Sequence, residues 1–337
     1  MDPRPDTPFV QAPGAAGPTV DLSVVFPVFN EVTNLDPLYQ EVRQALARME
    51  LTYELLFVDN GSDDGSLEAI KRLAWEDPAV QHVSLARNFP QQAAVFAGLC
   101  YASGRAVITM DADLQHPPAL IPALVERWRQ GYEVVYTTKR TYQISALRKL
   151  QTRLFYWILF RLSGLCLAFG VSDFRLLDRR VVDVLVRMPS YRKFLIGMVQ
   201  WVGFRQVGVE YDAAVRHSGE SKFSYLALVS FAVGGLVSFS NAPLRWILAV
   251  GAGLTLAAMG YAAWMAMLGV AAMSRAAVTW PPGWAHLAAA IVWLGGVQLL
   301  AIGVMGLYLG RIFEQSQGFP VFIVRETSLT REPQPHA

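Results

Sequence analysis

Residues 21–137 alternate short apolar runs with longer segments that carry helical periodicity. The runs are near-continuous stretches of aliphatic and β-branched residues, as expected for strands that are buried on both faces. They are residues 22–28, 54–58, 80–85, 106–109 and 133–137, and the helical segments between them are residues 35–50, 66–75, 92–103 and 119–130. This alternation predicts an α/β fold with a mostly parallel sheet and helices on both faces. The first run is not followed by G-x-G-x-x-G, which disfavours a dinucleotide-binding dehydrogenase.

The apolar residues are concentrated in the last third of the chain. Between residues 223 and 310 the sequence has no Asp, Glu or Lys, and only Arg245 and Arg275 carry a fixed charge. Two segments, residues 246–273 and roughly 286–310, each exceed the ~20 apolar residues needed to cross a bilayer. They raise the hydrophobic share of the whole chain to 53%. We therefore expect two transmembrane helices.

The charges around these segments predict how the chain is oriented. Residues 1–20 are rich in Pro, Gly and Ala and lack an apolar signal-peptide core, so a disordered tail is expected. The connection at residues 274–285 carries only Arg275, whereas the flanking segments hold more basic residues, namely Lys222, Arg245, Arg311 and Arg325. The positive-inside rule then predicts a multi-pass protein of the cytoplasmic (inner) membrane, with its N-terminal domain and both termini in the cytoplasm.

Five segments make up the predicted organisation. They are a disordered tail (1–20), a cytoplasmic α/β domain (21–222), a juxtamembrane interfacial helix (223–243), two transmembrane helices (244–310) and a cytoplasmic C-terminal tail (311–337). The stretch from Lys139 to Arg161 is basic and rich in aromatic residues, which is typical of an element at a membrane surface, with a solvated helix face as the alternative. Nucleic acid is not an expected partner, because the chain is anchored by two spans. Cys100 and Cys166 are isolated, which indicates no disulfide and no zinc site.

The strongest candidate site follows the fourth apolar run, where residues 110–118 read MDADLQHPP. Asp111 and Asp113 emerge where that strand ends, and ligands of open α/β sheets bind at this edge. With the amide oxygen of Gln115 they form an all-oxygen ligand set that suits Mg²⁺ or Mn²⁺. Such an ion completes its shell with substrate phosphates, which points to a nucleotide-diphosphate substrate. The competing interpretation is an acidic turn that caps the following helix.

Polar residues also follow the first two runs. Pro27 is expected to end the first strand, with Glu31 in the loop beyond it. Asp59 ends the second strand and precedes a turn that begins with Asn60 and Gly61. A carboxylate at a strand end can accept hydrogen bonds from ribose hydroxyls or from a base N–H. A helix cap is the alternative role for Glu31.

Six motifs occur in a fixed order along the chain. They are SVVFPVFNE (23–31), VDNGSDDGS (58–66), RNFPQQAA (87–94), MDADLQHPP (110–118), SDFRLLDRR (172–180) and GESKF (219–223). In this order and spacing the chain closely resembles the family-2 glycosyltransferases of the GT-A fold that load a sugar onto a polyprenyl phosphate. That group includes dolichol-phosphate mannose synthases and bacterial undecaprenyl-phosphate glucosyl and aminoarabinosyl transferases. The resemblance covers residues 21–326 and both apolar spans.

The resemblance implies an activity and a set of site residues. The activity is transfer of a sugar, with inversion, from a UDP- or GDP-linked donor to an undecaprenyl- or dolichyl-type phosphate, dependent on Mg or Mn. The implied nucleotide-sugar contacts are Pro27, Phe29, Glu31, Asp59, Asp111, Ala112 and Arg140. The implied metal ligands are Asp111, Asp113 and Gln115, the catalytic residues are Asp113 and Asp173, and the contacts to the acceptor phosphate are Arg216, Ser221 and Lys222. Membrane lipids and homo-oligomers are further implied partners.

Asp173 is expected to lie beside the acceptor. A phosphate monoester has its second pKa near about 6, so its oxygen is largely anionic at neutral pH and needs little help from a general base. Asp173 is therefore expected to position the phosphate or the sugar. The alternative from the sequence is that it caps a helix at residues 175–185.

The chain departs from the family pattern at four positions. Pro90 replaces a usual Gly, His116 stands where many bacterial relatives have Asp, and Ala119 stands where Glu is common. Ser172 replaces the Gly that commonly precedes the acid of the acceptor motif. None of these changes touches the predicted metal ligands.

The sequence disfavours two other functions. A processive polysaccharide synthase on the same fold is disfavoured because Q-x-x-R-W is absent, and Leu244-Arg245-Trp246 lacks the glutamine. A flippase or a non-catalytic membrane scaffold is disfavoured because two spans offer little transport path and the metal ligands are intact. The sequence does not specify the sugar or the base.

Overall fold

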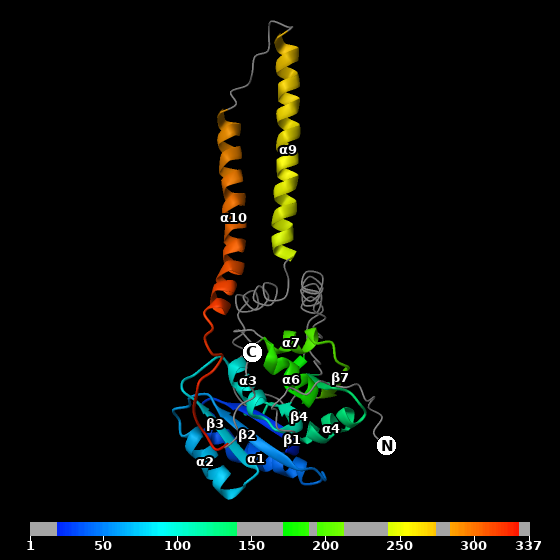
Figure 1. The fold of residues 1–337 in the computed structure, drawn as a ribbon, viewed down its shortest axis with the longest axis vertical. Coiled ribbons are helices and arrows are strands. Elements are labelled where there is room, and N and C mark those ends of the chain that lie inside the picture. Colours follow the sequence, from blue (N-terminus) through cyan, green and yellow to red (C-terminus); the bar gives the residue numbers. More distant parts are fainter. Residues whose placement is uncertain (1–18, 140–170, 189–193, 212–241, 274–283, 330–337) are drawn as a thin grey trace. The chain divides into compact units, whose positions relative to one another are not determined.

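The computed structural model describes residues 19–139, 171–188, 194–211, 242–273 and 284–329. The chain divides into two compact units. The first holds the mixed sheet and its helices and includes the segment from Phe319 onward. The second holds the two long helices. Each unit is described by itself, with labels that follow Figure 1.

Eight strands of the described ranges form one sheet in the order β7-β5-β6-β4-β1-β2-β3-β8 (Figure 1). Their bounds are β1 Val20–Val28, β2 Tyr53–Asp59, β3 Val80–Leu85, β4 Gly104–Thr109, β5 Val134–Lys139, β6 Val171–Asp178, β7 Gln206–Tyr211 and β8 Val324–Thr327. The pairs β1–β2, β1–β4, β2–β3 and β5–β7 are parallel, whereas β6 and β8 pair with their neighbours in antiparallel fashion. The predicted α/β fold with a mostly parallel sheet is confirmed.

Helices cover both faces of this sheet (Figure 1). Their bounds are α1 Val32–Leu46, α2 Ser66–Glu76, α3 Gln91–Tyr101, the short 3-10 helix η1 Pro118–Leu120, α4 Ile121–Arg129, α6 Arg179–Arg187 and α7 Leu195–Trp201. Helices α1, α2 and α4 pack together on one face, and α3 and α6 pack on the other. The four helices expected between the first five strands are therefore present.

Alternation along β1 supplies both cores. Leu22, Val24 and Phe26 are buried in the core under α1, α2 and α4. Val25 points to the opposite face, where α3 crosses the sheet. A Cβ on Gly98 of α3 would lie 2.1 Å from the Val25 Cγ1 atom, so only glycine allows this approach. The close contact lets α3 pack directly on β1.

The proline of β1 marks where the sheet opens. Met110 N donates to the Val25 carbonyl at 3.0 Å, and the pairing of β1 with β4 ends there. Backbone N–H and C=O groups alternate between the two neighbouring strands, so those of residue 27 face the β4 side, as those of residue 25 do. Pro27 therefore loses no ladder bond by lacking an N–H, although β1 continues beside β2 to Val28, one residue further than expected.

Strand β6 replaces the start of a predicted helix. The alternative interpretation of Asp173 placed a helix at residues 175–185, but residues Val171–Asp178 form a strand between β4 and β5. Phe174 and Leu176 alternate into the main core, which favours the strand. Helix α6 begins only at Arg179, and the Asp178 side chain caps it by accepting from Arg180 N at 3.0 Å. The alternative role of Asp173 as a helix cap is therefore wrong.

Strand β8 was not predicted. It adds to the free edge of β3, and Ala86 N donates to the Ile323 carbonyl at 2.8 Å beside it. Phe322 is 7% exposed and packs edge-on to Phe96 of α3, with ring centroids 6.4 Å apart. Residues that follow the second apolar helix in sequence thus form part of the sheet domain.

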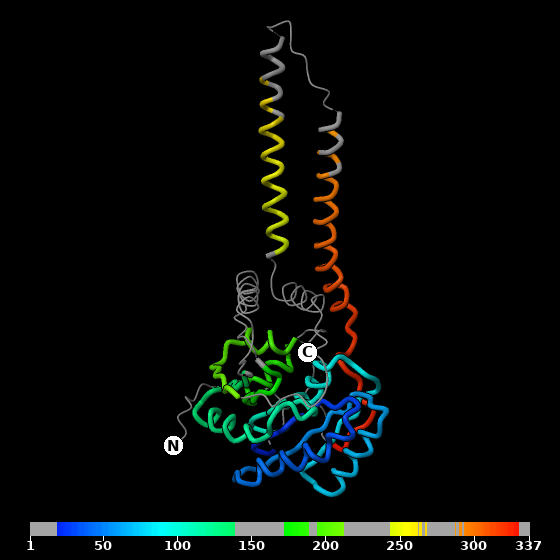
Figure 2. Tube along the Cα trace, turned by 180° about the vertical axis from the view of Figure 1, so that it is seen from behind, coloured from blue at the N-terminus to red at the C-terminus, as the bar shows by residue number. Residues whose placement is uncertain are grey.

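The second unit contains α9 (Ala242–Met273) and α10 (Trp284–Ser316), which lie side by side (Figure 2). In the described residues, these two helices are long and apolar enough to cross a membrane. Their apolar windows cover Pro243–Tyr261 and Trp293–Ser316. The predicted pair of spans agrees with them, while the predicted orientation stays a prediction. Most of the expected interfacial helix, and the tail before residue 19, lie outside the described residues.

Candidate active site

The site lies at the sheet edge where β1, β2 and β4 end and β6 begins. Because β6 runs antiparallel to β4, its first residues arrive beside the last residues of β4. The Thr109 hydroxyl fastens this junction by donating to the Asp173 carbonyl at 2.7 Å. Asp173 is thereby held next to the loop that begins with Asp111. The sequence predicted both segments as site motifs, and the fold brings them together.

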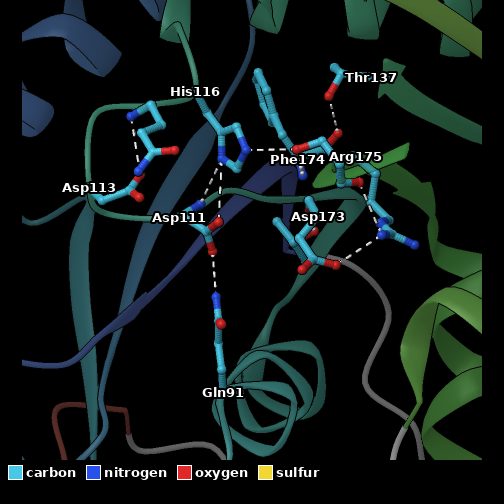
Figure 3. A network of polar contacts seen from close by, with 11 residues as sticks. Gln91, Asp111, Asp113, His116, Thr137, Asp173, Phe174 and Arg175 are labelled. Atoms are coloured by element: carbon cyan, nitrogen blue, oxygen red, sulfur yellow. Dashed lines mark hydrogen bonds and ion pairs between the residues drawn. The ribbon is translucent and has the colours of Figure 1, made fainter. Parts of the chain in front are cut away.

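Two contacts, one to the side chain and one to the backbone, hold Asp111 at the start of the acidic loop (Figure 3). Gln91 Nε2, on the first residue of α3, donates to Asp111 Oδ1 at 2.8 Å. On the other side, the Asp111 N–H faces His116 Nδ1 at 3.3 Å. Asp113 accepts from Gln115 N at 3.1 Å, which closes a tight turn around the pair. Both carboxylates are thus fixed by the chain before any ligand binds.

Backbone strain is confined to the loops of this edge. Asn30 and Leu114 are the only non-glycine residues of the described ranges with positive φ, at 57° and 60°. Such conformations are costly and collect at functional sites. Asn30 is held there by its side chain, which donates to Asp63 Oδ1 at 2.7 Å. The loops after β1 and β2 are therefore tied to each other.

A buried arginine accompanies Asp173, the carboxylate that the sequence predicts beside the acceptor. Arg175 Nη2 lies 3.0 Å from Asp173 Oδ1, and the Arg175 side chain is 4% exposed while that of Asp173 is 30% exposed (Figure 3). Burial lowers the pKa of Arg175, and the charges of Asp173 and Asp111 oppose that shift. An arginine remains cationic under such conditions. Its charge therefore interacts with both Asp173 and Asp111 of the acidic loop.

Glu31 belongs to the same acidic group. Burial raises the pKa of its carboxyl, and the nearby carboxylates of Asp113 and Asp64 raise it further. Its side chain accepts from Asn34, and it makes no side-chain cap to α1. The mutual repulsion shows that a cation at this edge would be favourable.

Asp59 is more enclosed than the sequence suggested. It is 1% exposed, and its carboxylate accepts from Ser62 N at 3.1 Å and from the Ser84 hydroxyl at 2.8 Å. The neighbouring Asn60 bonds to both the N–H and the carbonyl of Phe89. In this state Asp59 shapes the turn after β2, and its contact with a nucleotide stays a prediction.

The remaining predicted residues fall into two groups. Phe29 is 43% exposed beside the site, whereas Ala112 is buried, so only the backbone of Ala112 is available to a ligand. The predicted phosphate contacts lie outside the described residues, namely Arg140, Arg216, Ser221 and Lys222. Their roles stay predictions.

Sequence reasoning gave no role to Gln91 or Arg175. Both lie inside motifs that it singled out, RNFPQQAA and SDFRLLDRR. Gln91 needed the position of α3, and Arg175 needed the strand assignment of β6. A strand would place Arg175 on the same face as Asp173, so alternation was the one signal that could have found it.

The oxygen ligands of the acidic loop fit a hard cation that also coordinates phosphate oxygens. No cluster of three or more His, Cys, Asp or Glu side chains in the described residues is arranged to hold a metal by itself. Two carboxylates and an amide, Asp111, Asp113 and Gln115, are nevertheless what Mg²⁺ uses when substrate phosphates and water supply the remaining oxygens. The residues present therefore fit a magnesium or manganese ion bound together with a diphosphate.

Residues 23–185 match the glycosyl transferase family 2 model. Together with the close relatives below, this match shows that the chain belongs to glycosyltransferase family 2. Its α/β domain is the GT-A-like domain of that family, and the protein is a glycosyltransferase.

Relatives extend over nearly the whole chain. An uncharacterized glycosyltransferase of Synechocystis is 37% identical over 91% of this chain and 96% of its own length. The bactoprenol glucosyl transferase of Shigella phage SfV is 36% identical over 90% of this chain and 98% of its own. The prophage bactoprenol glucosyl transferase homolog of Escherichia coli is 35% identical over 90% of this chain.

One solved structure is more distantly similar. Glucosyl-3-phosphoglycerate synthase from Mycobacterium tuberculosis, in complex with Mn²⁺, uridine-diphosphate and phosphoglyceric acid, is 18% identical. The similarity covers 67% of this chain and 80% of that one, with a TM-score of 0.48. The metal and the ligands in that complex are properties of that protein.

Proposed function

We propose that the protein transfers a sugar from a nucleotide-diphosphate sugar to a polyprenyl phosphate at the cytoplasmic face of the inner membrane. The observation that carries this proposal is the meeting of the Asp111–Asp113 loop with Asp173 at one sheet edge, in a chain that ends in two apolar helices. Relatives named bactoprenol glucosyl transferases, which cover 90% of the chain, favour a polyprenyl acceptor and a glucosyl donor.

The donor binds across the ends of β1, β2 and β4. Phe29 offers an exposed aromatic face for the base, while Glu31, Asp111 and Asp113 direct oxygen atoms toward the diphosphate side. A bound Mg²⁺ or Mn²⁺ would neutralise the charge that develops on the leaving diphosphate. The protein's own part is to hold both loop carboxylates in place through Gln91 and the turn at Asp113.

The acceptor binds on the β6 side. Its phosphate oxygen attacks the anomeric carbon as the nucleoside diphosphate leaves from the opposite face, and this single displacement inverts the anomeric configuration. Asp173 positions the phosphate or the sugar. The Arg175 guanidinium, 3.0 Å from Asp173 Oδ1, fixes the direction of the Asp173 carboxylate. Arg216, Ser221 and Lys222 grip the lipid phosphate just before the membrane segment in sequence.

The activity can be tested with purified full-length protein in detergent. Undecaprenyl phosphate is incubated with a panel of radiolabelled UDP- and GDP-sugars, and the lipid product is extracted. We expect labelled lipid from one donor, UDP-glucose first, with inverted configuration at the anomeric carbon. Absence of labelled lipid with every donor, from protein that binds nucleotide, would refute the acceptor assignment.

The orientation has its own test. A reporter fused after Ala337 is expected in the cytoplasm, and a cysteine between Thr279 and Trp284 is expected to react with reagents added from outside. Labelling of that cysteine only after the membrane is permeabilised would refute the proposed topology.

A further inference from the structure

A buried chain of hydrogen bonds joins the acidic loop to strand β6. His116 Nε2 lies 2.7 Å from the Ser172 hydroxyl oxygen, and on the other side of the ring Nδ1 faces the Asp111 N–H at 3.3 Å. His116 is 4% exposed and Ser172 is 9% exposed. The imidazole also packs on Phe174, with ring centroids 5.5 Å apart (Figure 3). The ring is therefore held on three sides.

The partners of the ring define its hydrogen-bond roles. A backbone N–H can only donate, so in the neutral ring that accepts from the Asp111 N–H at Nδ1 the proton is on Nε2. That proton is donated to the Ser172 oxygen, which also accepts from Phe174 N at 3.3 Å. The Asp111 Oδ2 atom also lies 3.7 Å from Nδ1, so both polar groups of Asp111 face this side of the ring. The imidazole thus acts as a spacer of fixed length between Asp111 and the residue that precedes Asp173.

We propose that His116 and Ser172 are a pair of positioning residues that set the distance between Asp173 and the Asp111–Asp113 loop. The proposal rests on the proposed function, because it takes Asp173 to serve the acceptor and the loop to serve the donor. Nucleophile and leaving group must be aligned, and a misplacement of about 1 Å can cost roughly 10²-fold in rate.

Tyr211 is the competing partner for Ser172. It ends β7, is 5% exposed, and its hydroxyl makes no hydrogen bond within the described part of the chain. Burial raises its pKa, and the nearby Ser172 hydroxyl acts in the opposite direction, so the two hydroxyls are close. If Ser172 served mainly to orient Tyr211, then Tyr211→Phe would reproduce the effect of Ser172→Ala.

Two replacements of His116 test the contacts of Nδ1 and Nε2 separately. Asn can imitate the Nδ1 side but does not reach Ser172, whereas Gln can place an amide donor near the Nε2 position. We expect Ser172→Ala and His116→Asn each to lower kcat about ten-fold, since each leaves a buried polar group unpaired. The donor KM should stay within about two-fold, and His116→Gln should restore most of kcat.

The decisive measurement is a double-mutant cycle. Because both single variants break the same contact, His116→Asn with Ser172→Ala should lose no more kcat than the worse single variant. Independent effects would instead multiply to about a hundred-fold loss, and that result would overturn the link. Equal kcat for His116→Asn and His116→Gln, or a Tyr211→Phe variant that matches Ser172→Ala, would overturn it as well.

A control variant and a second measurement distinguish failure of this link from failure of the proposed function. Thr137→Val removes another buried bond to the same strand, from the Thr137 hydroxyl to the Phe174 carbonyl at 2.9 Å, without touching His116. Its loss should add to that of His116→Asn. The same cycles measured as apparent melting temperatures need no substrate. A wild type that makes no lipid product refutes the function, whereas additive melting shifts for His116→Asn and Ser172→Ala refute the link.

Discussion

The proposed donor side and the proposed acceptor side of the site are built differently, although they share one sheet edge. The donor side consists of loops after the parallel strands β1, β2 and β4, where consecutive βα units place the chain's polar residues at one edge. The acceptor side depends on β6, an antiparallel strand inserted between β4 and β5. The first side comes from consecutive βα units, whereas the second needs Asp173, which follows its partner Thr109 by 64 residues and reaches it through an antiparallel strand.

This difference explains what the two sides can tolerate. The donor loops are tied to each other by the hydrogen bond from Asn30 to Asp63, and to α3 by Gln91. Asp173 is placed by Thr109, Arg175 and Ser172, which lie around one strand. Changes on the donor side should therefore abolish all chemistry on the donor, whereas changes on the acceptor side should leave the donor site working.

The largest expected effect is on the donor side. Asp113→Asn should lower transfer roughly a thousand-fold, because a neutral amide is a poorer ligand for a hard cation and metal ions contribute several kcal/mol to such reactions. Wild-type turnover should stop in EDTA and return with Mg²⁺ or Mn²⁺. The matched control is Asp36→Asn, an exposed carboxylate paired with Arg72, which should be silent. Full turnover in excess chelator would contradict the metal assignment.

An effect of intermediate size is expected from the acceptor grip. A charge-assisted hydrogen bond from Lys222 to the lipid phosphate is worth roughly 1.5–3 kcal/mol, so Lys222→Ala should lower the rate at limiting acceptor about ten- to a hundred-fold. Binding of the nucleotide sugar should not change. The test is to vary acceptor and donor separately in detergent. An equal loss in the dependence on acceptor and in the dependence on donor would show that Lys222 does not act on the acceptor alone.

A stability effect should follow from strand β8, far from the chemistry. Phe322→Ala empties a buried position beside Phe96 and should cost about 3 kcal/mol, the lower end for a buried phenylalanine because this residue lies at the sheet edge. We expect a lower apparent melting temperature with an unchanged donor KM. Phe319→Ala, at a residue that is 58% exposed, is the control. Equal shifts for both variants would show that the packing of Phe322 on Phe96, just before β8, does not stabilise the domain.

The smallest effect concerns an exposed ion pair on the same strand. Lys71 Nζ lies 2.6 Å from Glu326 Oε1, and the hydrogen bond from Lys71 lowers the pKa of Glu326. A lowered carboxyl pKa contributes stability above the ordinary glutamate pKa, and that contribution is lost as the pH falls through the folded value. Glu326→Gln should therefore cost about 0.2–1 kcal/mol near neutral pH and nothing in acid. A cost that persists in acid would contradict this origin.

The same contrast explains how far the sequence could lead. Asp111, Asp113 and Glu31 follow near-continuous apolar runs, so their common edge follows from the parallel βα pattern alone. Strand β6 could not be predicted in this way, because SDFRLLDRR carries the capping signal of a helix and its strand character comes from pairing with β4 and β5. Strand β8 is similar. It has only four residues, it follows a 33-residue apolar helix in the sequence, and it forms a strand because β3 offers a free edge.

Side-chain partners were still harder to anticipate. Asp59 looks from the sequence like an open ligand, but its carboxylate is engaged by Ser62 and by Ser84, which lies on another strand. Contacts of this kind depend on register across the sheet, which no local pattern encodes. The acidic motif itself was predictable, whereas the residues that hold it were not.

The most direct test measures sugar transfer and donor hydrolysis in the same reaction. The donor is the nucleotide sugar that the wild type uses. Release of nucleoside diphosphate and formation of labelled lipid are measured for three proteins, namely the wild type, Asp113→Asn and Asp173→Asn. The account predicts that Asp113→Asn loses both products of donor cleavage, whereas Asp173→Asn loses transfer to the lipid phosphate but keeps the slow hydrolysis by water. Equal loss of transfer and hydrolysis in Asp173→Asn would contradict the division of the site into a donor side and an acceptor side.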